Sequence, residues 1–341
     1  MSESYKSDAL AFYRDAVVID SLNVSNWDSP AVIESLQAGG ITAFNATTAT
    51  LENFTQTLDN IAAWLHRIER YQDVLMQVKS TADIGRAKQE GKVGVILGFQ
   101  NATPIENYLD RLALFHALGV RVIQLTYNER NLLGNGCFER RDDGLSNFGV
   151  DAVAEMNRLG IVIDLSHVGE RTTVEAIETS ARPVAITHAN AKSYYDTERN
   201  KTDEAITRCA EKGGVIGATS ITTFLRKGPA STLADFVDAI DDLVARVGID
   251  HVGVGNDFTQ DQPDAFWKYI LSQQGTKYPG KFVADPAIDY RKVQLYPPGL
   301  ETPADMPNLA VALLERGYSQ ADAAKLLGGN WLRLFVDVWA S

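Results

Sequence analysis

The chain has 341 residues, of which 45% are hydrophobic and 22% charged, so it holds enough apolar material for one large core or two smaller ones. Its formal net charge of −12 at pH 7 disfavours nucleic acid and anionic membrane surfaces as partners, because both repel an acidic protein. We therefore expect an ordinary soluble globular protein that acts on small molecules.

The cysteines and the start of the chain indicate where such a protein works. Cys137 and Cys209 are too few for a disulfide framework, and the first eight residues lack the basic and hydrophobic regions of a secretion signal. No apolar run approaches the roughly 20 residues that a membrane-spanning helix needs. We expect a cytoplasmic location and no membrane partner.

Short runs of β-branched residues alternate with longer amphipathic stretches, which predicts repeated strand–helix units around parallel strands. The eight predicted strands are 16–23, 40–47, 93–100, 121–127, 161–166, 183–189, 214–220 and 251–257. The predicted helices include 51–74, 105–118, 149–159, 172–179, 203–212, 232–247, 303–316 and 319–339. This order predicts an α/β protein with a (β/α)8 TIM barrel, as a single domain over residues 1–341 with C-terminal helices. A doubly wound open sheet is the alternative.

Two connections after predicted strands stand out. Residues 128–148, after the fourth strand, contain glycines that permit tight turns and close approach of the backbone to a ligand. Residues 258–302, after the eighth strand, are rich in Asp, Tyr, Trp and Pro and exceed the usual length of a connection. Because barrel enzymes place catalytic loops at the C-terminal face, we interpret the longer connection as a candidate lid.

Polar side chains end the predicted strands at that same face. They are Asn23, Asn45, Gln100, Tyr127, His167, His188, Thr219 and Asp257. His167 and His188 end neighbouring strands and Asp257 ends the eighth, so the three could converge on one metal ion. Asp257 could also take a proton from a metal-bound water. The alternative is that both imidazoles are hydrogen-bonded residues of a metal-free pocket.

Other residues near these motifs are given structural interpretations. Asp164 lies three residues before His167, so strand alternation predicts that it points away from that imidazole. Gly253 and Gly255 lack the third glycine and the following helix of a dinucleotide fingerprint, and we expect no nucleotide cofactor.

At these residues the chain resembles the membrane dipeptidase family, also called renal dipeptidase-like or peptidase M19, of the amidohydrolase superfamily. The segments that carry the resemblance are 163–168, 183–188, 199–200, 253–258 and 328–333. The resemblance implies a barrel of the metal-dependent hydrolase type that holds two zinc ions and hydrolyses dipeptides. It further implies that His167 and His188 bind one zinc, that Asp257 carries the proton and that Arg199 clamps the substrate's terminal carboxylate.

Several positions depart from the family pattern. Leu22 and Val24 stand where the family has a His-x-Asp metal pair, and Gln100 stands for its metal-bridging Glu. Neither aliphatic side chain binds zinc, and a neutral amide cannot hold two cations together. Tyr127 replaces a substrate-contacting His of many members. We therefore expect at most one Zn²⁺ or similar ion, on His167, His188 and water, with Asp257 or Gln100 completing its shell.

Three functions are consistent with this sequence. The first is a dipeptidase-like hydrolase that cleaves an amide or peptide bond in a small carboxylate-bearing substrate, with at most one zinc ion. Its substrate would contact Arg199, Tyr127, Gln100 and Asn23. The second is a metal-free member that binds an amino-acid-like metabolite without hydrolysing it, and the third is a lyase or isomerase on the same barrel. A homodimer is the assembly that symmetric closure favours, although the sequence shows no diagnostic interface.

Overall fold

The strands of the computed structural model, which describes residues 3–270 and 293–339, form a parallel barrel. The strands of the barrel are β1 (Ile19–Asn23), β2 (Ala43–Ala49), β4 (Val93–Phe99), β5 (Val120–Gln124), β6 (Val162–Asp164), β7 (Ala185–Ile186), β8 (Val215–Ala218) and β9 (Val252–Val254). They are hydrogen-bonded in this order, and every neighbouring pair is parallel. The eight predicted strands are confirmed.

The barrel closes where the chain beyond β9 runs beside β1. The backbone N–H of Asp257 donates to the oxygen of Leu22 at 3.1 Å, and the N–H of Val24 donates to the oxygen of Phe258 at 2.8 Å. An open doubly wound sheet would leave β1 and β9 apart, so this contact decides between the two predicted architectures. The (β/α)8 barrel is confirmed.

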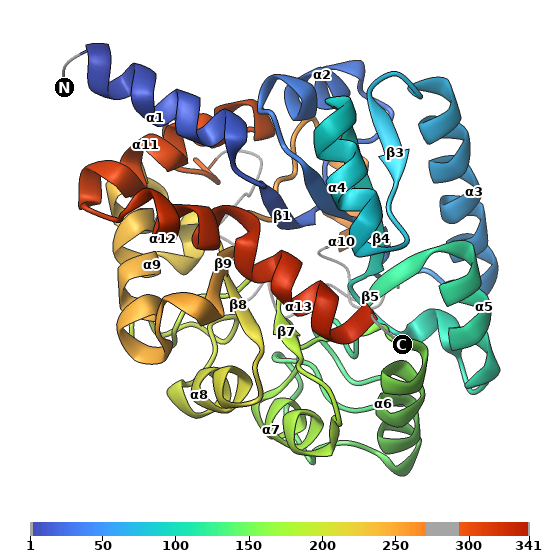
Figure 1. Cartoon of the computed structure of the whole chain (residues 1–341). Coiled ribbons are helices and arrows are strands. Elements are labelled where there is room, and N and C mark those ends of the chain that lie inside the picture. The colour runs from blue at the N-terminus through green and yellow to red at the C-terminus, as the bar shows by residue number, and fades with distance from the viewer. Residues whose placement is uncertain (1–2, 271–292, 340–341) are drawn as a thin grey trace.

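Helices cover the outside of the barrel (Figure 1). Those that follow the strands are α2 (Pro30–Ala38), α3 (Phe54–Arg70), α4 (Thr81–Glu90), α5 (Asp110–Leu118), α6 (Asn147–Leu159), α7 (Glu170–Thr179), α8 (Asp203–Glu211) and α9 (Leu233–Val247). The others are α1 (Glu3–Asp15), α10 (Asp264–Ile270), α11 (Met306–Arg316), α12 (Gln320–Ala324) and α13 (Asn330–Trp339). Within the described ranges, none is long and apolar enough to cross a bilayer.

The barrel wall is largely apolar, as parallel strands covered by helices require, although buried polar side chains such as Asn45 and Asp164 also belong to its strands. All seven residues of β4 are buried, and they form a nearly continuous hydrophobic run. Gly98 interrupts that run because a Cβ there would lie 2.1 Å from Oδ1 of Asn45, which fills the barrel interior beside it. Large apolar side chains elsewhere on β4 pack outward against the helices.

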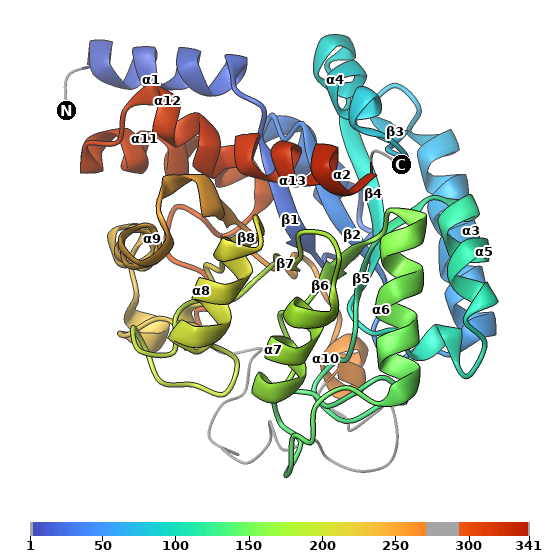
Figure 2. The same cartoon turned by 60° about the horizontal axis from the view of Figure 1, so that its bottom comes forward.

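Helix α13 closes the end of the barrel where the strands begin. Trp331, Leu334 and Phe335 of this helix pack in one cluster with residues from the starts of the strands, among them Ile19 and Val215. The indole N–H of Trp331 also donates to the oxygen of Val254 at 3.0 Å. Figure 2 shows α13 at one end of the strands and α10 at the other. A ligand site is therefore expected at the α10 end, where the strands stop.

Several elements differ from the sequence prediction. The helix predicted over 51–74 ends at Arg70, and the chain then forms a short strand, β3 (Leu75–Gln77), which pairs with β4. Helices α1, α2, α4 and α10 were not among the predicted elements, whereas α6, α7, α8, α9 and α11 were predicted to within a few residues. The helix predicted over 319–339 is divided into α12 and α13. About half of the candidate lid 258–302, namely residues 271–292, lies outside the described residues, and α10 is the helical part that the structure describes.

Candidate active site

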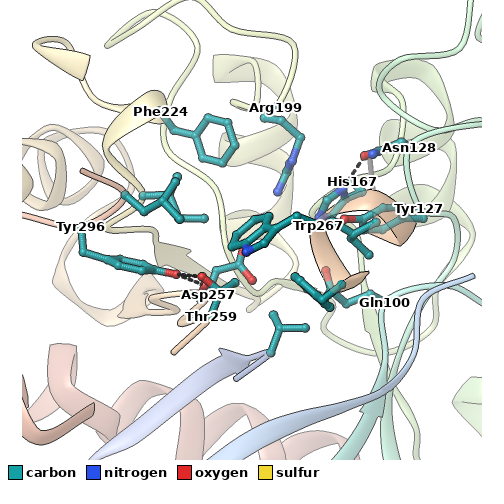
Figure 3. Close-up of a pocket in the computed structure, with 15 residues that line it drawn as sticks. Gln100, Tyr127, Asn128, His167, Arg199, Phe224, Asp257, Thr259, Trp267 and Tyr296 are labelled. Atoms are coloured by element: carbon teal, nitrogen blue, oxygen red, sulfur yellow. Dashed lines mark hydrogen bonds between the residues drawn. The ribbon is translucent and has the colours of Figure 1, made fainter. Parts of the chain in front are cut away.

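A cavity lies at the α10 end of the barrel, where the strands stop (Figure 3). Its walls are Val24, Gln100, Tyr127, Asn128, His167, Arg199, Ile221, Phe224, Asp257, Thr259, Phe266, Trp267, Ile270, Leu295 and Tyr296. Five of the seven residues predicted for the site are among them: Gln100, Tyr127, His167, Arg199 and Asp257. His188 lies behind His167, and Asn23 is buried away from the cavity wall.

The two predicted histidines contact each other directly. Their Nε2 atoms are 2.9 Å apart, and both side chains are buried. Nδ1 of His167 lies 2.7 Å from Oδ1 of Asn128, and Nδ1 of His188 lies 2.7 Å from Oγ1 of Thr187. Tyr127 stacks on the His167 ring with the two ring centres 4.2 Å apart. All four ring nitrogens therefore have polar partners.

The surroundings of this pair favour uncharged imidazoles. Burial holds the pKa of His167 and of His188 well below the usual 6.5, and the positive charge of Arg199 lowers both pKa values further. Lys201 acts in the same direction on both rings. The site thus disfavours positive charge near the imidazoles.

Asp257 lies just beyond β9 in a left-handed backbone conformation, with φ of 60°. Few residues other than glycine adopt this conformation, although Asp tolerates it better than most. Tyr296 donates its hydroxyl hydrogen to the backbone oxygen of Asp257 at 2.6 Å. Burial raises the pKa of the carboxyl to about 7, against the opposing effect of Arg199. Near neutral pH this carboxyl can therefore both accept and donate a proton.

Arg199 brings an uncompensated positive charge to the cavity. Arg199 is 2% exposed, and its guanidinium donates to the backbone oxygens of Ser166 at 2.8 Å and His188 at 3.3 Å. The ring of Phe224 lies 5.3 Å from its carbon Cζ. Among the described residues, no carboxylate is within ion-pair distance of it. Buried charges in proteins are normally paired, so this one indicates an anionic ligand.

Lys201 is a second buried cation close to Arg199, and sequence reasoning missed it. Its Nζ donates to the backbone oxygen of Val168 and, at 3.2 Å, to Oγ1 of Thr173. Burial lowers its pKa to about 8. Its position two residues after Arg199 was the signal that could have identified it.

The remaining predicted residues are held by their neighbours. Gln100 donates from Nε2 to Oγ1 of Thr47 at 3.1 Å while lining the cavity. Asn23 accepts from the N–H of Ser25 at 3.0 Å, and its Nδ2 has no hydrogen-bond partner among the described residues. Gln100 is therefore available to a ligand, whereas Asn23 supports the barrel beneath.

The described residues do not fit a zinc centre. They contain no group of three or more His, Cys, Asp or Glu side chains that could hold a metal ion. The two imidazoles would supply two ligands, whereas zinc sites in proteins use three or four protein ligands. Leu22 and Val24 are hydrophobic, and Arg199 adds positive charge. The expected single ion stays a prediction.

Comparison with known proteins identifies the family. Residues 22–274 and 280–340 match the family model described as membrane dipeptidase, peptidase family M19. The chain belongs to this family. The resemblance predicted from the sequence motifs is confirmed, while the departures at Leu22, Val24 and Gln100 stay predictions.

Two of the similar curated proteins are named dipeptidases. Dipeptidase tcpJ of Claviceps purpurea (strain 20.1) is 30% identical over 80% of this chain and 58% of its own length. Dipeptidase verJ of Clonostachys rogersoniana is 28% identical over 85% of this chain and 67% of its own length. The chain thus spans between half and two thirds of the length of these relatives.

Solved structures are similar over nearly the whole chain. An amidohydrolase from Pseudomonas aeruginosa is 38% identical, with a TM-score of 0.92 over 98% of this chain and 99% of that one. A metallo peptidase of family M19, dipeptidase AC, is 23% identical, with a TM-score of 0.79 over 96% of this chain and 99% of that one. The second likeness shows the fold alone.

Proposed function

We propose that this dipeptidase-family protein is a hydrolase that cleaves an amide or peptide bond in a small substrate bearing a carboxylate. The single observation that carries the proposal is the pairing of Arg199 and Asp257 in one cavity. Figure 3 shows both side chains pointing toward the middle of that cavity. One side chain is a buried cation without an acidic partner, and the other is a carboxyl with a pKa of about 7.

Arg199 supports recognition of the substrate's carboxylate. A guanidinium has five N–H donors, and the two hydrogen bonds to Ser166 and His188 leave others for a ligand. Because those two bonds fix the guanidinium plane, a carboxylate could bind with little loss of side-chain freedom. The low exposure of Arg199 strengthens the charge-assisted hydrogen bonds by excluding water.

Asp257 supports the transfer of the proton. In its ionised form the carboxylate would take a proton from the attacking water as the new C–O bond forms at the amide carbon. The protonated carboxyl would then give that proton to the leaving nitrogen as the C–N bond breaks. A carboxyl with a pKa near the working pH is suited to both steps.

The other walls of the cavity support orientation of the substrate. Tyr127 and Gln100 provide polar groups on one side, and Phe266 and Trp267 of α10 provide apolar surface. Such a mixture of apolar area and a few polar groups is typical of small-molecule sites. We assign no step to zinc, because the described residues would give it two ligands.

The decisive experiment is a hydrolysis assay of dipeptides and their C-terminal amides, in chelator-treated and zinc-supplemented protein. We expect turnover of dipeptides with a free carboxylate, and about 100-fold weaker kcat/KM for the amides, as the loss of a charged partner predicts. Replacement of Asp257 by Asn, which preserves shape, should reduce kcat by about 10²–10⁴-fold.

Two outcomes would count against the proposal. Tight binding of amino-acid-like ligands without turnover of any dipeptide would favour the metal-free binding protein. Equal activity on dipeptides and their amides would remove the role assigned to Arg199.

A further inference from the structure

The part of the cavity wall beside Arg199 is apolar. It consists of Ile221, Phe224 and Leu295, which we call the apolar wall. The ring centre of Phe224 lies 5.3 Å from Cζ of Arg199, and Figure 3 shows the two side chains on the same side of the cavity. Ile221 and Phe224 are buried, and Leu295 is partly buried. A ligand group bound to Arg199 would therefore have hydrocarbon surface next to it.

Backbone hydrogen bonds hold the three members of the apolar wall together. The N–H of Phe224 donates to the oxygen of Ile221 at 3.0 Å, which closes the short turn after β8. Within that turn, the N–H of Thr222 donates to the oxygen of Leu295 at 2.8 Å. The apolar wall thus joins the loop after β8 to the connection after β9 in one hydrogen-bonded unit.

The same unit is attached to the segment that carries Arg199. Asn200 directly follows Arg199, and its Nδ2 donates to the backbone oxygen of Phe224 at 3.2 Å. Nδ2 of Asn190 donates to the same oxygen at 3.3 Å, and the N–H of Asn190 donates to Oδ1 of Asn200 at 3.1 Å. All three hydrogen bonds are buried. They set the position of the apolar wall relative to the guanidinium.

The charges around the cavity exclude charged partners for this part of the wall. Among the described residues that line the cavity, the Asp, Glu, Lys and Arg side chains are Arg199 and Asp257. A basic side chain of a substrate would be repelled by Arg199, and an acidic one would compete with the substrate's own carboxylate for it. A charged side chain beside the carboxylate would thus lose its hydration without gaining a partner.

We propose that the apolar wall makes the protein prefer substrates whose carboxylate-bearing residue has a large, uncharged hydrocarbon side chain, such as that of Leu or Phe. The inference rests on the proposed function in one respect, which is the binding of the carboxylate by Arg199. The carboxylate and the side chain of that residue leave the same Cα atom. A carboxylate held by Arg199 therefore brings this side chain to the apolar wall.

Burial of the side chain supplies the preference. Each methylene group that leaves water for an apolar site changes binding by about fourfold. The full change from Gly to Leu should therefore raise kcat/KM by about 10–100-fold. Lys is similar in length to these side chains but charged, so it should bring no such gain.

The test is a comparison of two series of dipeptides on the protein as purified. In the first series, Gly is followed by Gly, Ala, Leu, Phe, Lys or Glu, and in the second the same residues precede Gly. We expect kcat/KM to rise about 10–100-fold from Gly-Gly to Gly-Leu, with Gly-Lys and Gly-Glu no better than Gly-Gly. The second series should rise less, because its variable residue lies farther from Arg199. An equal rise in both series, or a better rate with Gly-Lys or Gly-Glu than with Gly-Leu, would overturn the proposal.

A variant of the most exposed member of the apolar wall tests its role directly. Leu295→Ala should reduce the ratio of kcat/KM for Gly-Leu to that for Gly-Gly by about 5–10-fold, because less hydrocarbon surface faces the substrate. Leu314→Ala is the matched control, since Leu314 is also partly buried but belongs to α11 and does not line the cavity. The same ratio in both variants would contradict the role of the apolar wall.

Failure of this inference and failure of the proposed function give different results. Turnover that does not depend on the C-terminal residue would leave the hydrolase in place and remove the preference. Absence of turnover for every dipeptide would remove the hydrolase, and calorimetric binding of the first series to the wild-type protein then decides the preference. Tighter binding of Gly-Leu than of Gly-Gly and Gly-Lys would support it, and equal binding would overturn it.

Discussion

Tyr296 fixes the backbone of Asp257 by a hydrogen bond of 2.6 Å from its hydroxyl to the Asp257 oxygen. The same hydroxyl lies 3.0 Å from Oγ1 of Thr259, and the ring contacts Phe258. Residues on both sides of a long connection therefore hold the left-handed conformation of Asp257, the residue proposed to carry the proton. This relationship links the loop after β9 to the chemistry of the cavity.

The first prediction concerns that hydrogen bond. Tyr296→Phe should reduce the free energy of unfolding by about 1–2 kcal/mol, because a buried acceptor loses its donor. It should also lower kcat several-fold with a smaller change in KM, because Asp257 is less well oriented. Chemical denaturation and steady-state kinetics measure the two effects. Tyr318→Phe is the matched control, since Tyr318 donates to Asp241 away from the cavity. Equal kinetic effects in the two variants would contradict the prediction.

The second prediction concerns the pH dependence of hydrolysis. The pKa of Asp257 is raised to about 7, so its basic form predominates above that pH, and kcat/KM should rise through pH 7 to a plateau. Arg199 lowers this pKa, and Arg199→Gln should therefore move the rise to higher pH while Arg199→Lys should move it less. A pH profile of each variant is the measurement. A rise at the same pH in Arg199→Gln would show that another group controls the rate.

The third prediction concerns stability and Asp20. Burial raises the pKa of this fully buried carboxyl to about 8. The folded protein therefore retains a proton that the unfolded chain releases near pH 4, and stability should fall as pH rises from about 4 to about 8. Asp20→Asn should remove this fall and stabilise the protein at pH 8 by several kcal/mol, on the order of 1.4 kcal/mol for each pKa unit.

The structure offers a further reason for that gain. Oδ1 of Asn256 is buried without a partner among the described residues, and the backbone N–H of Asn256 donates to Oδ1 of Asp20 at 2.9 Å. An Asn at position 20 keeps that acceptor and adds a donor nearby. Thermal melts from pH 5 to 9 test the prediction, with Asp59→Asn as the exposed control. A pH slope that persists in Asp20→Asn would contradict it.

The fourth prediction concerns the closed end of the barrel. Trp331→Ala should destabilise the protein by about 3–5 kcal/mol, because it removes a fully buried ring from the cluster at the starts of the strands. Val336→Ala on the same helix should cost less than about 1 kcal/mol, since Val336 is 47% exposed. Denaturant unfolding gives both values. Because α13 lies at the far end from the cavity, the folded Trp331→Ala protein should retain the wild-type KM.

Much of the barrel could be predicted because its strands are local patterns. Runs such as β4 are apolar throughout, and parallel strands end at a common face, so His167 and His188 could be expected to meet. β3 was missed because three residues give too short a pattern to separate from the end of α3. The site residue Tyr296 was missed because it belongs to a connection whose path no periodicity reveals.

Asp164 shows a different limit of prediction from sequence. Strand alternation predicts that it points away from His167, and the structure shows no direct contact between their side chains. Asp164 reaches that imidazole through Thr187 and His188, which directly follow the neighbouring strand β7. Spacing along one strand cannot reveal a partner that the neighbouring strand supplies, so this connection emerged only from the three-dimensional arrangement.

Helix α13 closes one end of the barrel and thereby determines from which side a ligand reaches the cavity. Trp331 and Phe335 pack against the first residues of the strands, so apolar side chains fill this end of the barrel. A substrate and both products of its cleavage would then pass the α10 end of the barrel, so a product that leaves slowly would compete with the next substrate for the cavity.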